Sequence, residues 1–213
     1  MSNLDARRAR ASHGFTLLEL MVVLAVMGII AGVALPYMNR TLEYMKLSGA
    51  ARSVAGGTSA AKMRSAAKFT RARLYVDRSG NSFHLEILDT SVPLPLPMAG
   101  GHWIADGGTT YLPSGVTFGF GLVAAAPLNT QPALGQAAPC TDDNLAVIST
   151  TTSCIMFNSR GIPVKDDGTG NPTDAAALYV TDGTNVYGIT VLATGFIGTW
   201  HKPSAPAPAW VIS

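Results

Sequence analysis

The sequence has little charge and contains none of the short motifs that mark common enzyme classes. Only 13% of its 213 residues are charged, whereas 47% are hydrophobic. It has no HExxH zinc motif, no GxSxG nucleophile motif and no glycine loop suited to phosphate. The four histidines are scattered, and two cysteines without histidines at metal-binding spacing do not indicate a zinc site. We therefore expect no catalytic residues, no metal, no cofactor and no enzymatic activity.

One apolar run dominates the N-terminal part of the chain. It extends from Phe15 to Leu35, its only strongly polar residue is Glu19, and it follows a leader that contains Arg7, Arg8 and Arg10. A helix of these 21 residues would be about 31 Å long, close to the thickness of the hydrocarbon core of a bilayer. Basic residues keep their end of such a helix in the cytoplasm. The sequence therefore predicts one membrane-spanning helix with the rest of the chain across the membrane.

Glu19 is unfavourable in this setting and calls for a partner. A carboxylate near the centre of a bilayer costs on the order of 3 kcal/mol, and less towards either end. A conventional signal peptide is the alternative, with Gly32-Val33-Ala34 as a small-residue cleavage site. The apolar run is long for a signal peptide, however, and an acid inside one is unfavourable.

The residues around Glu19 resemble the processing site of type IV prepilins and type II secretion pseudopilins. The stretch Gly14-Phe15-Thr16-Leu17-Leu18-Glu19-Leu20 follows a short basic leader and precedes an apolar helix, as in those families. The resemblance implies that a prepilin peptidase cuts after Gly14, that Phe15 becomes the N-methylated first residue, and that Glu19 is the assembly carboxylate. The free amine of Phe15 can pair with Glu19 of a neighbouring subunit and fix the register of packed helices.

The predicted fold class is α+β and pilin-like, with a long N-terminal hydrophobic helix whose C-terminal half packs on an antiparallel β-sheet head. We expect a cytoplasmic leader peptide at 1–14, a transmembrane and filament-stem helix at 15–36, its amphipathic continuation at 37–68, and a β-rich periplasmic head at 69–213. Pro36 predicts a helix kink, because proline removes one backbone hydrogen bond. Gly56-Gly57 predicts a second weak point in the helix.

Short runs of β-branched and aromatic residues between turns predict the strands of the head. We expect strands at 69–76, 82–88, 146–150, 155–157, 177–181, 186–192 and 196–200, one or two more within 103–120, and turns at 77–81 and 182–185. Alternating prolines at 93–97 predict an extended linker. Residues 124–139, which are rich in Ala, Pro and Gln, predict an exposed loop.

Cys140 and Cys154 are the only cysteines, and the head is expected outside the cytoplasm, where a disulfide can persist. We favour a bond between them over two free buried thiols. Such a bond contributes about 3 kcal/mol in the chain-entropy model. Asp166-Asp167-Gly168 fits a solvated turn better than a Ca²⁺ site. Trp200 and Trp210, near a proline-rich tail, either pack on the head or contact a partner.

Charge is divided unevenly along the chain. Residues 40–78 contain nine basic and two acidic residues, whereas residues 79–213 contain three basic and nine acidic residues. A solvated basic helix face beside lipid phosphates explains this pattern better than nucleic-acid binding, because aromatic residues are not interleaved with the basic ones.

The head resembles the GspH/FimT group of minor pilins and pseudopilins. The matching stretches are residues 60–86, 112–116, 155–161 and 178–199. Some competence-linked members of that group bind DNA through Gly-Arg-x-Arg near the C-terminus. The corresponding stretch here, Gly198-Thr199-Trp200-His201-Lys202, has neither arginine, which argues against nucleic acid as a partner.

The sequence therefore predicts a structural subunit of a type II secretion pseudopilus, which supports protein secretion across the outer membrane. The alternatives are a minor subunit of a type IV pilus, a DNA-binding competence pilin, and a secreted β-rich protein released after Ala34. The implied partners are other pilin or pseudopilin subunits, the prepilin peptidase/methyltransferase, an inner-membrane assembly platform and membrane lipid. The expected location is the bacterial inner membrane, single-pass with a periplasmic head, and then a periplasmic or surface filament.

Overall fold

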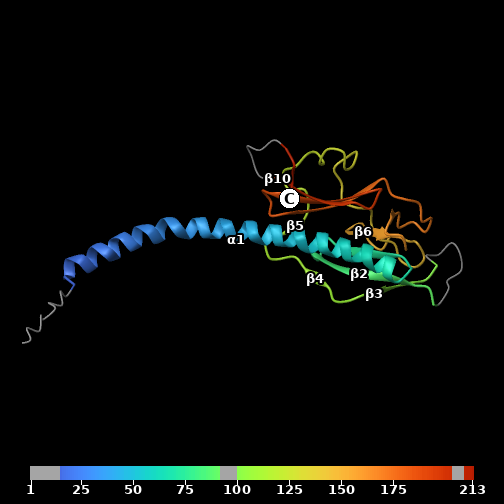
Figure 1. The fold of residues 1–213 in the computed structure, drawn as a ribbon, viewed down its shortest axis with the longest axis horizontal. Helices are drawn as coiled ribbons and strands as arrows, with labels where there is room; N and C mark the ends of the chain where they lie inside the picture. The colour runs from blue at the N-terminus through green and yellow to red at the C-terminus, as the bar shows by residue number, and fades with distance from the viewer. Residues whose placement is uncertain (1–14, 92–99, 203–208) are drawn as a thin grey trace, which may run out of the picture. The chain divides into compact units, whose positions relative to one another are not determined.

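The computed structural model describes residues 15–91, 100–202 and 209–213, and the proline linker expected at 93–97 lies outside these ranges (Figure 1). One long helix is followed by antiparallel strands, which confirms the predicted α+β, pilin-like fold class. The chain divides into two compact units, residues 1–42 and 43–213.

All strand pairs in the two sheets are antiparallel. Sheet A has the order β3-β2-β1-β6-β7, with β4 also paired to β2, and sheet B has the order β11-β10-β9-β8-β5. The strands of sheet A are β1 Ala72–Asp77, β2 Ser82–Asp89, β3 His102–Ala105, β4 Thr110–Tyr111, β6 Thr152–Phe157 and β7 Pro163–Val164. Those of sheet B are β5 Thr117–Phe118, β8 Ala175–Thr181, β9 Val186–Leu192, β10 Ile197–Lys202 and β11 Val211–Ile212.

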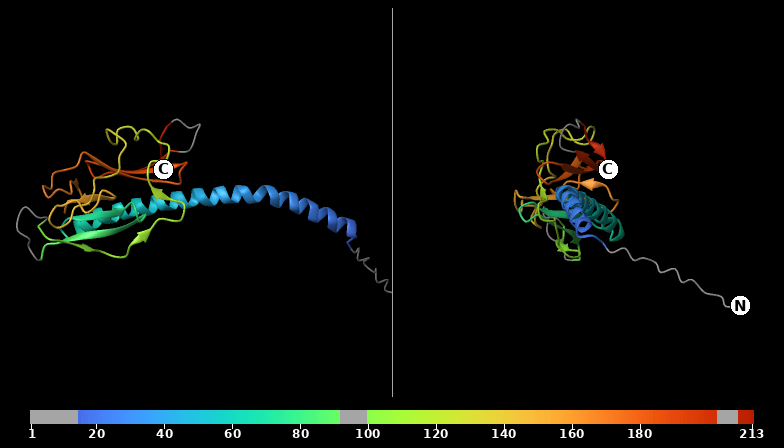
Figure 2. Two further views of the ribbon diagram at one scale, coloured as in Figure 1. Left: turned by 180° about the vertical axis from the view of Figure 1, so that it is seen from behind. Right: turned by 90° about the vertical axis from the view of Figure 1, so that its left-hand side faces the viewer.

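Helix α1, Leu17–Ala67, supplies one side of the core of the second unit. Its buried residues recur every three or four positions, as expected for one helix face: Leu47, Ala50, Ala51, Val54, Thr58, Ala61 and Ser65. This face packs with side chains of both sheets in one hydrophobic cluster, and Figure 2 shows this C-terminal part of the helix beside both sheets. The helix ends close to the predicted residue 68, where Phe69 takes the left-handed conformation (φ 51°) that commonly terminates helices.

The weak point predicted at Gly56-Gly57 is wrong, because α1 continues through both residues. Gly57 lies against Leu74 and Phe83 of sheet A. A Cβ atom at this position would be 3.0 Å from Cδ1 of Leu74 and 3.1 Å from Cε2 of Phe83. The absence of a side chain at Gly57 therefore permits helix–sheet packing.

The neighbouring glycines provide a matched test of that packing. We expect Gly56→Ala to stabilise the head by about 0.5–1 kcal/mol, because its Cβ meets nothing within 4 Å and alanine favours the helix. Gly57→Ala is expected to be about 1–2 kcal/mol less stable than Gly56→Ala, because Leu74 and Phe83 are buried and cannot move aside. Urea unfolding of the two variants measures the difference, and equal stabilities would contradict the account.

Two expectations for the irregular regions are also corrected. Residues 146–150 form no strand, apart from an isolated bridge between Thr141 and Val147. The carboxylate of Asp142 accepts the backbone N–H groups of Asn144 and Ala146, both at 2.9 Å, and holds a turn instead. Residues 124–139 form a loop, but it is not wholly exposed, since Thr130 and Ala137 are buried.

Candidate functional site

The first turn of α1 is closed by a local cap next to Phe15. The hydroxyl of Thr16 accepts the backbone N–H of Glu19 at 3.2 Å, and its carbonyl accepts the N–H of Leu20 at 3.2 Å. Thr-x-x-Glu is the spacing of a capping box. Glu19 therefore lies in the first turn, where a carboxylate interacts favourably with the positive end of the helix dipole by about 0.3–1 kcal/mol. Phe15 directly precedes the capping residue Thr16, and the helix begins at Leu17.

The helical segment after this cap exposes apolar side chains on every side. All residues from 15 to 32 are exposed, among them twelve large apolar ones between Phe15 and Ile30. A helix that is apolar all round is stable when other apolar groups cover it, whereas a surface helix of a globular protein keeps a polar face. This segment therefore needs a covering partner, and Glu19 is the only charged side chain between residues 15 and 32.

Across residues 15–91, 100–202 and 209–213, no helix is both long enough and apolar enough to cross a membrane. The span expected at 15–36 stays a prediction. Gly14 lies outside the described residues. Pro36 lies within α1, which continues across it, and the kink expected there also stays a prediction.

A comparison with known families identifies the N-terminal segment. The family model of the prokaryotic N-terminal methylation motif matches residues 9–35. The match supports a type IV pilin-like protein. No curated protein and no solved structure matches the chain. The matched range contains the capped helix start and the whole exposed apolar segment, residues 15–32.

The pilin-like motif indicates a structural subunit that assembles with other pilin subunits and is a substrate of a prepilin peptidase. It also indicates membrane anchoring through the N-terminal helix. The matched residues end at position 35, so they do not extend to the head.

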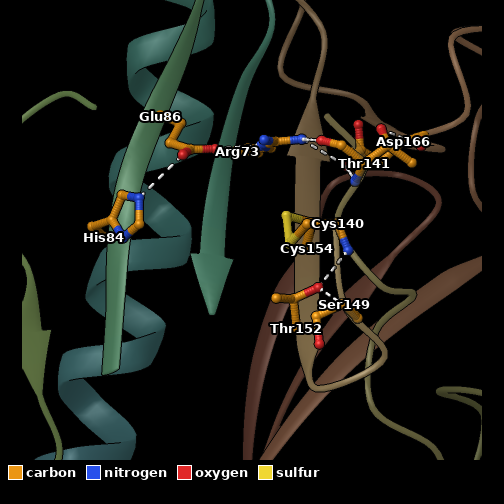
Figure 3. The surroundings of a disulfide bond; sticks show 9 residues. All are labelled: Arg73, His84, Glu86, Cys140, Thr141, Ser149, Thr152, Cys154 and Asp166. Atoms are coloured by element: carbon orange, nitrogen blue, oxygen red, sulfur yellow. Dashed lines mark hydrogen bonds and ion pairs between the residues drawn. A yellow bond between two sulfur atoms is a disulfide. The ribbon is translucent and has the colours of Figure 1, made fainter. Parts of the chain in front are cut away.

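A buried arginine organises the outer face of sheet A in the head. Arg73, on β1, is only 1% exposed, and its Nε lies 2.6 Å from Oε2 of Glu86 on β2. Its Nη1 lies 2.8 Å from Oδ2 of Asp166 and donates to the carbonyl of Thr141 at 2.7 Å. Figure 3 shows Arg73 between Glu86 on one side and Thr141 and Asp166 on the other. The guanidinium also stacks over the ring of Trp103, 3.9 Å from its centroid.

A disulfide joins Cys140 and Cys154 beside this arginine, with an S–S distance of 2.06 Å (Figure 3). Cys154 lies on β6, so the bond attaches the loop that precedes β6 to the sheet. The backbone N–H of Cys140 also donates to Oγ1 of Thr152 at 3.0 Å. The disulfide and the arginine together hold the same loop against sheet A.

Sequence reasoning did not identify Arg73 as special, and it considered Asp166 only as a turn or calcium residue. The register of the β1–β2 hairpin could have indicated that Arg73 forms an ion pair, because Arg73 and Glu86 occupy directly opposed positions on the two strands. Asp166 is engaged by Arg73 and by the backbone N–H of Thr141 at 2.9 Å. Within the described ranges, no group of three or more potential metal ligands is present.

A second cluster connects Tyr44 of α1, near the start of the head, to sheet B. The ring of His201, on β10, stacks on Tyr187, on β9, with centroids 4.4 Å apart. Tyr44 of α1 meets the edge of His201 at 5.8 Å, and the Tyr187 hydroxyl donates to the Tyr44 hydroxyl at 3.1 Å. Burial lowers the pKa of His201 below its usual value, although the charge of Asp182 acts in the opposite direction. The cluster therefore favours the neutral imidazole.

This pKa shift gives a prediction for the pH dependence of stability. The unfolded chain binds a proton at His201 more readily than the folded chain does, so stability falls as the pH drops through the usual histidine pKa. We expect the urea midpoint to decrease between about pH 7 and pH 5, and His201→Phe to flatten that decrease. An equally steep decrease in the variant would show that His201 does not cause it.

Proposed function

We propose that this chain is a minor pilin-like subunit, a pseudopilin, that assembles into a type II secretion pseudopilus and supports protein secretion across the outer membrane. The observation that carries the proposal is the match to the N-terminal methylation motif at residues 9–35, together with the position of Glu19 in the capped first turn of α1. The resemblance of the head to the GspH/FimT group favours a minor subunit. A minor subunit of a type IV pilus is the second candidate, because the same motif serves both machines.

Cleavage of the leader creates the positive charge that pairs with Glu19, namely the new amine of Phe15. In the proposal, prepilin peptidase cuts between Gly14 and Phe15, and the enzyme's methyltransferase activity modifies the new amine of Phe15. This amine is a cation at the positive end of the helix dipole, where a positive charge is unfavourable. A carboxylate from a neighbouring subunit compensates it, so cleavage converts an inert chain into one that gains stability by docking.

Assembly then follows from the exposed apolar segment. Packing of residues 15–32 against the same segment in other subunits removes apolar surface from water or lipid, but packing alone does not fix the register. An ion pair between Glu19 of one subunit and the Phe15 amine of the next fixes it, because any shift leaves both charges unpaired at low dielectric. An inner-membrane assembly platform and membrane lipid are the proposed surroundings of this step, and the head lies in the periplasm.

Nucleic acid is not among the proposed partners. Three of the basic residues between 40 and 78 are already engaged within the head. Arg64 pairs with Asp106 at 3.0 Å, Lys62 donates to the carbonyl of Gly195 at 2.8 Å, and Arg73 is buried. The basic charge counted from the sequence is therefore only partly available to phosphate groups.

An in-frame deletion in the native host tests the choice of machine. The proposal predicts that substrates of type II secretion accumulate in the periplasm while surface pili and their retraction remain normal. Expression of the wild-type chain should restore secretion. Loss of pili with normal secretion would instead assign the subunit to a type IV pilus.

A further inference from the structure

A groove on the outer face of sheet B remains unexplained by filament-stem assembly. We call it the tryptophan groove; it is a cavity of about 480 Å³ whose walls include Ala125, Leu128, Asn129, Trp200 and Trp210. Trp200 points away from the core face of β10, since its neighbour His201 stacks on Tyr187 and side chains alternate along a strand. The volume lies within the range of typical ligand sites.

Both indole rings in the groove are held in fixed orientations. Nε1 of Trp200 donates to Oγ1 of Thr190 at 2.9 Å, and Nε1 of Trp210 donates to the carbonyl of Ala125 at 2.9 Å. The indole N–H groups are thus satisfied internally, and the rings offer apolar surface to a ligand. Leu128, at the rim, is 85% exposed. A fixed pair of indoles beside an exposed leucine suits a proline-rich ligand, because proline-rich segments dock in aromatic-lined grooves with little loss of entropy.

We propose that the tryptophan groove binds the segment Pro93-Leu94-Pro95-Leu96-Pro97 of a second copy of this chain. The segment alternates proline with leucine, so its apolar side chains match the two indoles and Leu128, while Lys202 adds one basic residue to the wall of the groove. Its prolines cannot donate backbone hydrogen bonds, so recognition through side-chain surfaces suits it better than strand pairing.

The connection that contains residues 93–97 is too short to reach the groove of its own chain, so the bound segment comes from another copy. The segment belongs to the connection between Asp89 and His102. These two residues pair with each other on β2 and β3, so the two ends of the connection lie side by side. Its twelve residues can reach at most about 20 Å from these ends and back.

The groove lies farther away than that. Leu88, beside Asp89, donates its backbone N–H to the carbonyl of Arg71, just beyond the end of α1 at Ala67. His201, next to Trp200, contacts Tyr44. Tyr44 and Ala67 are separated by about 35 Å along the helix, so the segment cannot enter the groove of its own chain.

This inference rests on the proposed function, because a filament supplies second copies or related subunits at close range. It adds a contact between heads to the packing between stems. The end of one head that carries the Asp89–His102 connection would then meet the opposite end of the next head. Its test does not depend on processing of the N-terminus.

Binding of a labelled peptide to the full-length chain in detergent micelles tests the proposal. The probe is a fluorescein-labelled synthetic peptide with the sequence of residues 91–98, SVPLPLPM, and the control peptide is SVALALAM. We expect saturable binding of the first peptide, measured by fluorescence anisotropy, and much weaker binding of the second. Leu128→Ala is expected to weaken binding by about fivefold. Leu122→Ala is the matched control, since Leu122 is equally exposed at 86% and does not line the groove.

Three results would overturn the inference: no saturable binding, equal binding of both peptides, or equal loss in the two leucine variants. A variant with residues 203–208 replaced by Gly and Ser provides the last check. Binding that appears only in this variant would mean that the chain covers its own groove, which contradicts the proposal. If the mature chain starts at Phe15 but does not bind the peptide, only this inference is contradicted. If the chain binds the peptide but starts at another residue, only the pilin assignment is contradicted.

Discussion

Glu19→Gln is expected to abolish incorporation of the subunit into filaments while leaving cleavage and methylation unchanged. Glutamine keeps the size and helix preference of glutamate but has no charge to pair with the amine of Phe15. An amine left unpaired in a packed interface costs about 3–5 kcal/mol, which corresponds to a loss of more than about 100-fold in docking. The measurement is the share of the subunit in sheared filaments relative to the membrane fraction, by immunoblot.

The matched control for this prediction is Glu43→Gln, which removes the next carboxylate along α1, outside the motif. It is expected to assemble like the wild type. Mass spectrometry of the N-terminus should give the same processed start in both variants. Normal assembly of the Glu19→Gln subunit would contradict the role of this carboxylate, whereas failure of both variants would show a general effect of charge on α1.

Arg73→Met is expected to destabilise the head by about 3–5 kcal/mol, because it leaves two buried carboxylates without their counter-ion. The side chains of Glu86 and Asp166 are 14% and 6% exposed, so water cannot replace the guanidinium fully. The variant also loses the stacking over Trp103 and the hydrogen bond to the carbonyl of Thr141. Urea unfolding at pH 7, followed by tryptophan fluorescence, measures the change.

Arg160→Met is the control for the arginine, since Arg160 is exposed and its substitution should change stability by less than about 0.5 kcal/mol. Adding Glu86→Gln and Asp166→Asn to Arg73→Met should recover part of the loss, because the buried negative charges are then removed. If Arg73→Met unfolds at the same urea concentration as Arg160→Met, the ion cluster does not hold the loop on sheet A.

The features that were predictable from the sequence have local signals. The helix end near residue 68 and the hairpin turns at 77–81 and 182–185 follow from residues that are neighbours in the chain. Asp77, for example, accepts the backbone N–H of Gly80 at 3.0 Å, and Asp182 accepts that of Asn185 at 2.7 Å. Hydrogen bonds of this kind also lower the pKa of Asp77, through the Ser79 hydroxyl first and the backbone of Gly80 next.

The features that were missed depend on partners far away in the chain. Gly57 looks like a helix breaker until Leu74 and Phe83 are placed against it. The strand expected at 146–150 has suitable residues, but the preceding turn at Asp142 and the tie at Cys140 direct the chain elsewhere. Arg73 is one of nine basic residues between positions 40 and 78, and only the packed loop with Asp166 distinguishes it.

The most direct test of the central proposal is the intact mass and N-terminal sequence of the chain purified from its native membrane. The account predicts a mature protein that begins at N-methylated Phe15, with residues 1–14 removed and Glu19 in its first helical turn. A protein that begins at Leu35 would contradict it, because signal peptidase would then have removed the apolar segment and Glu19 with it.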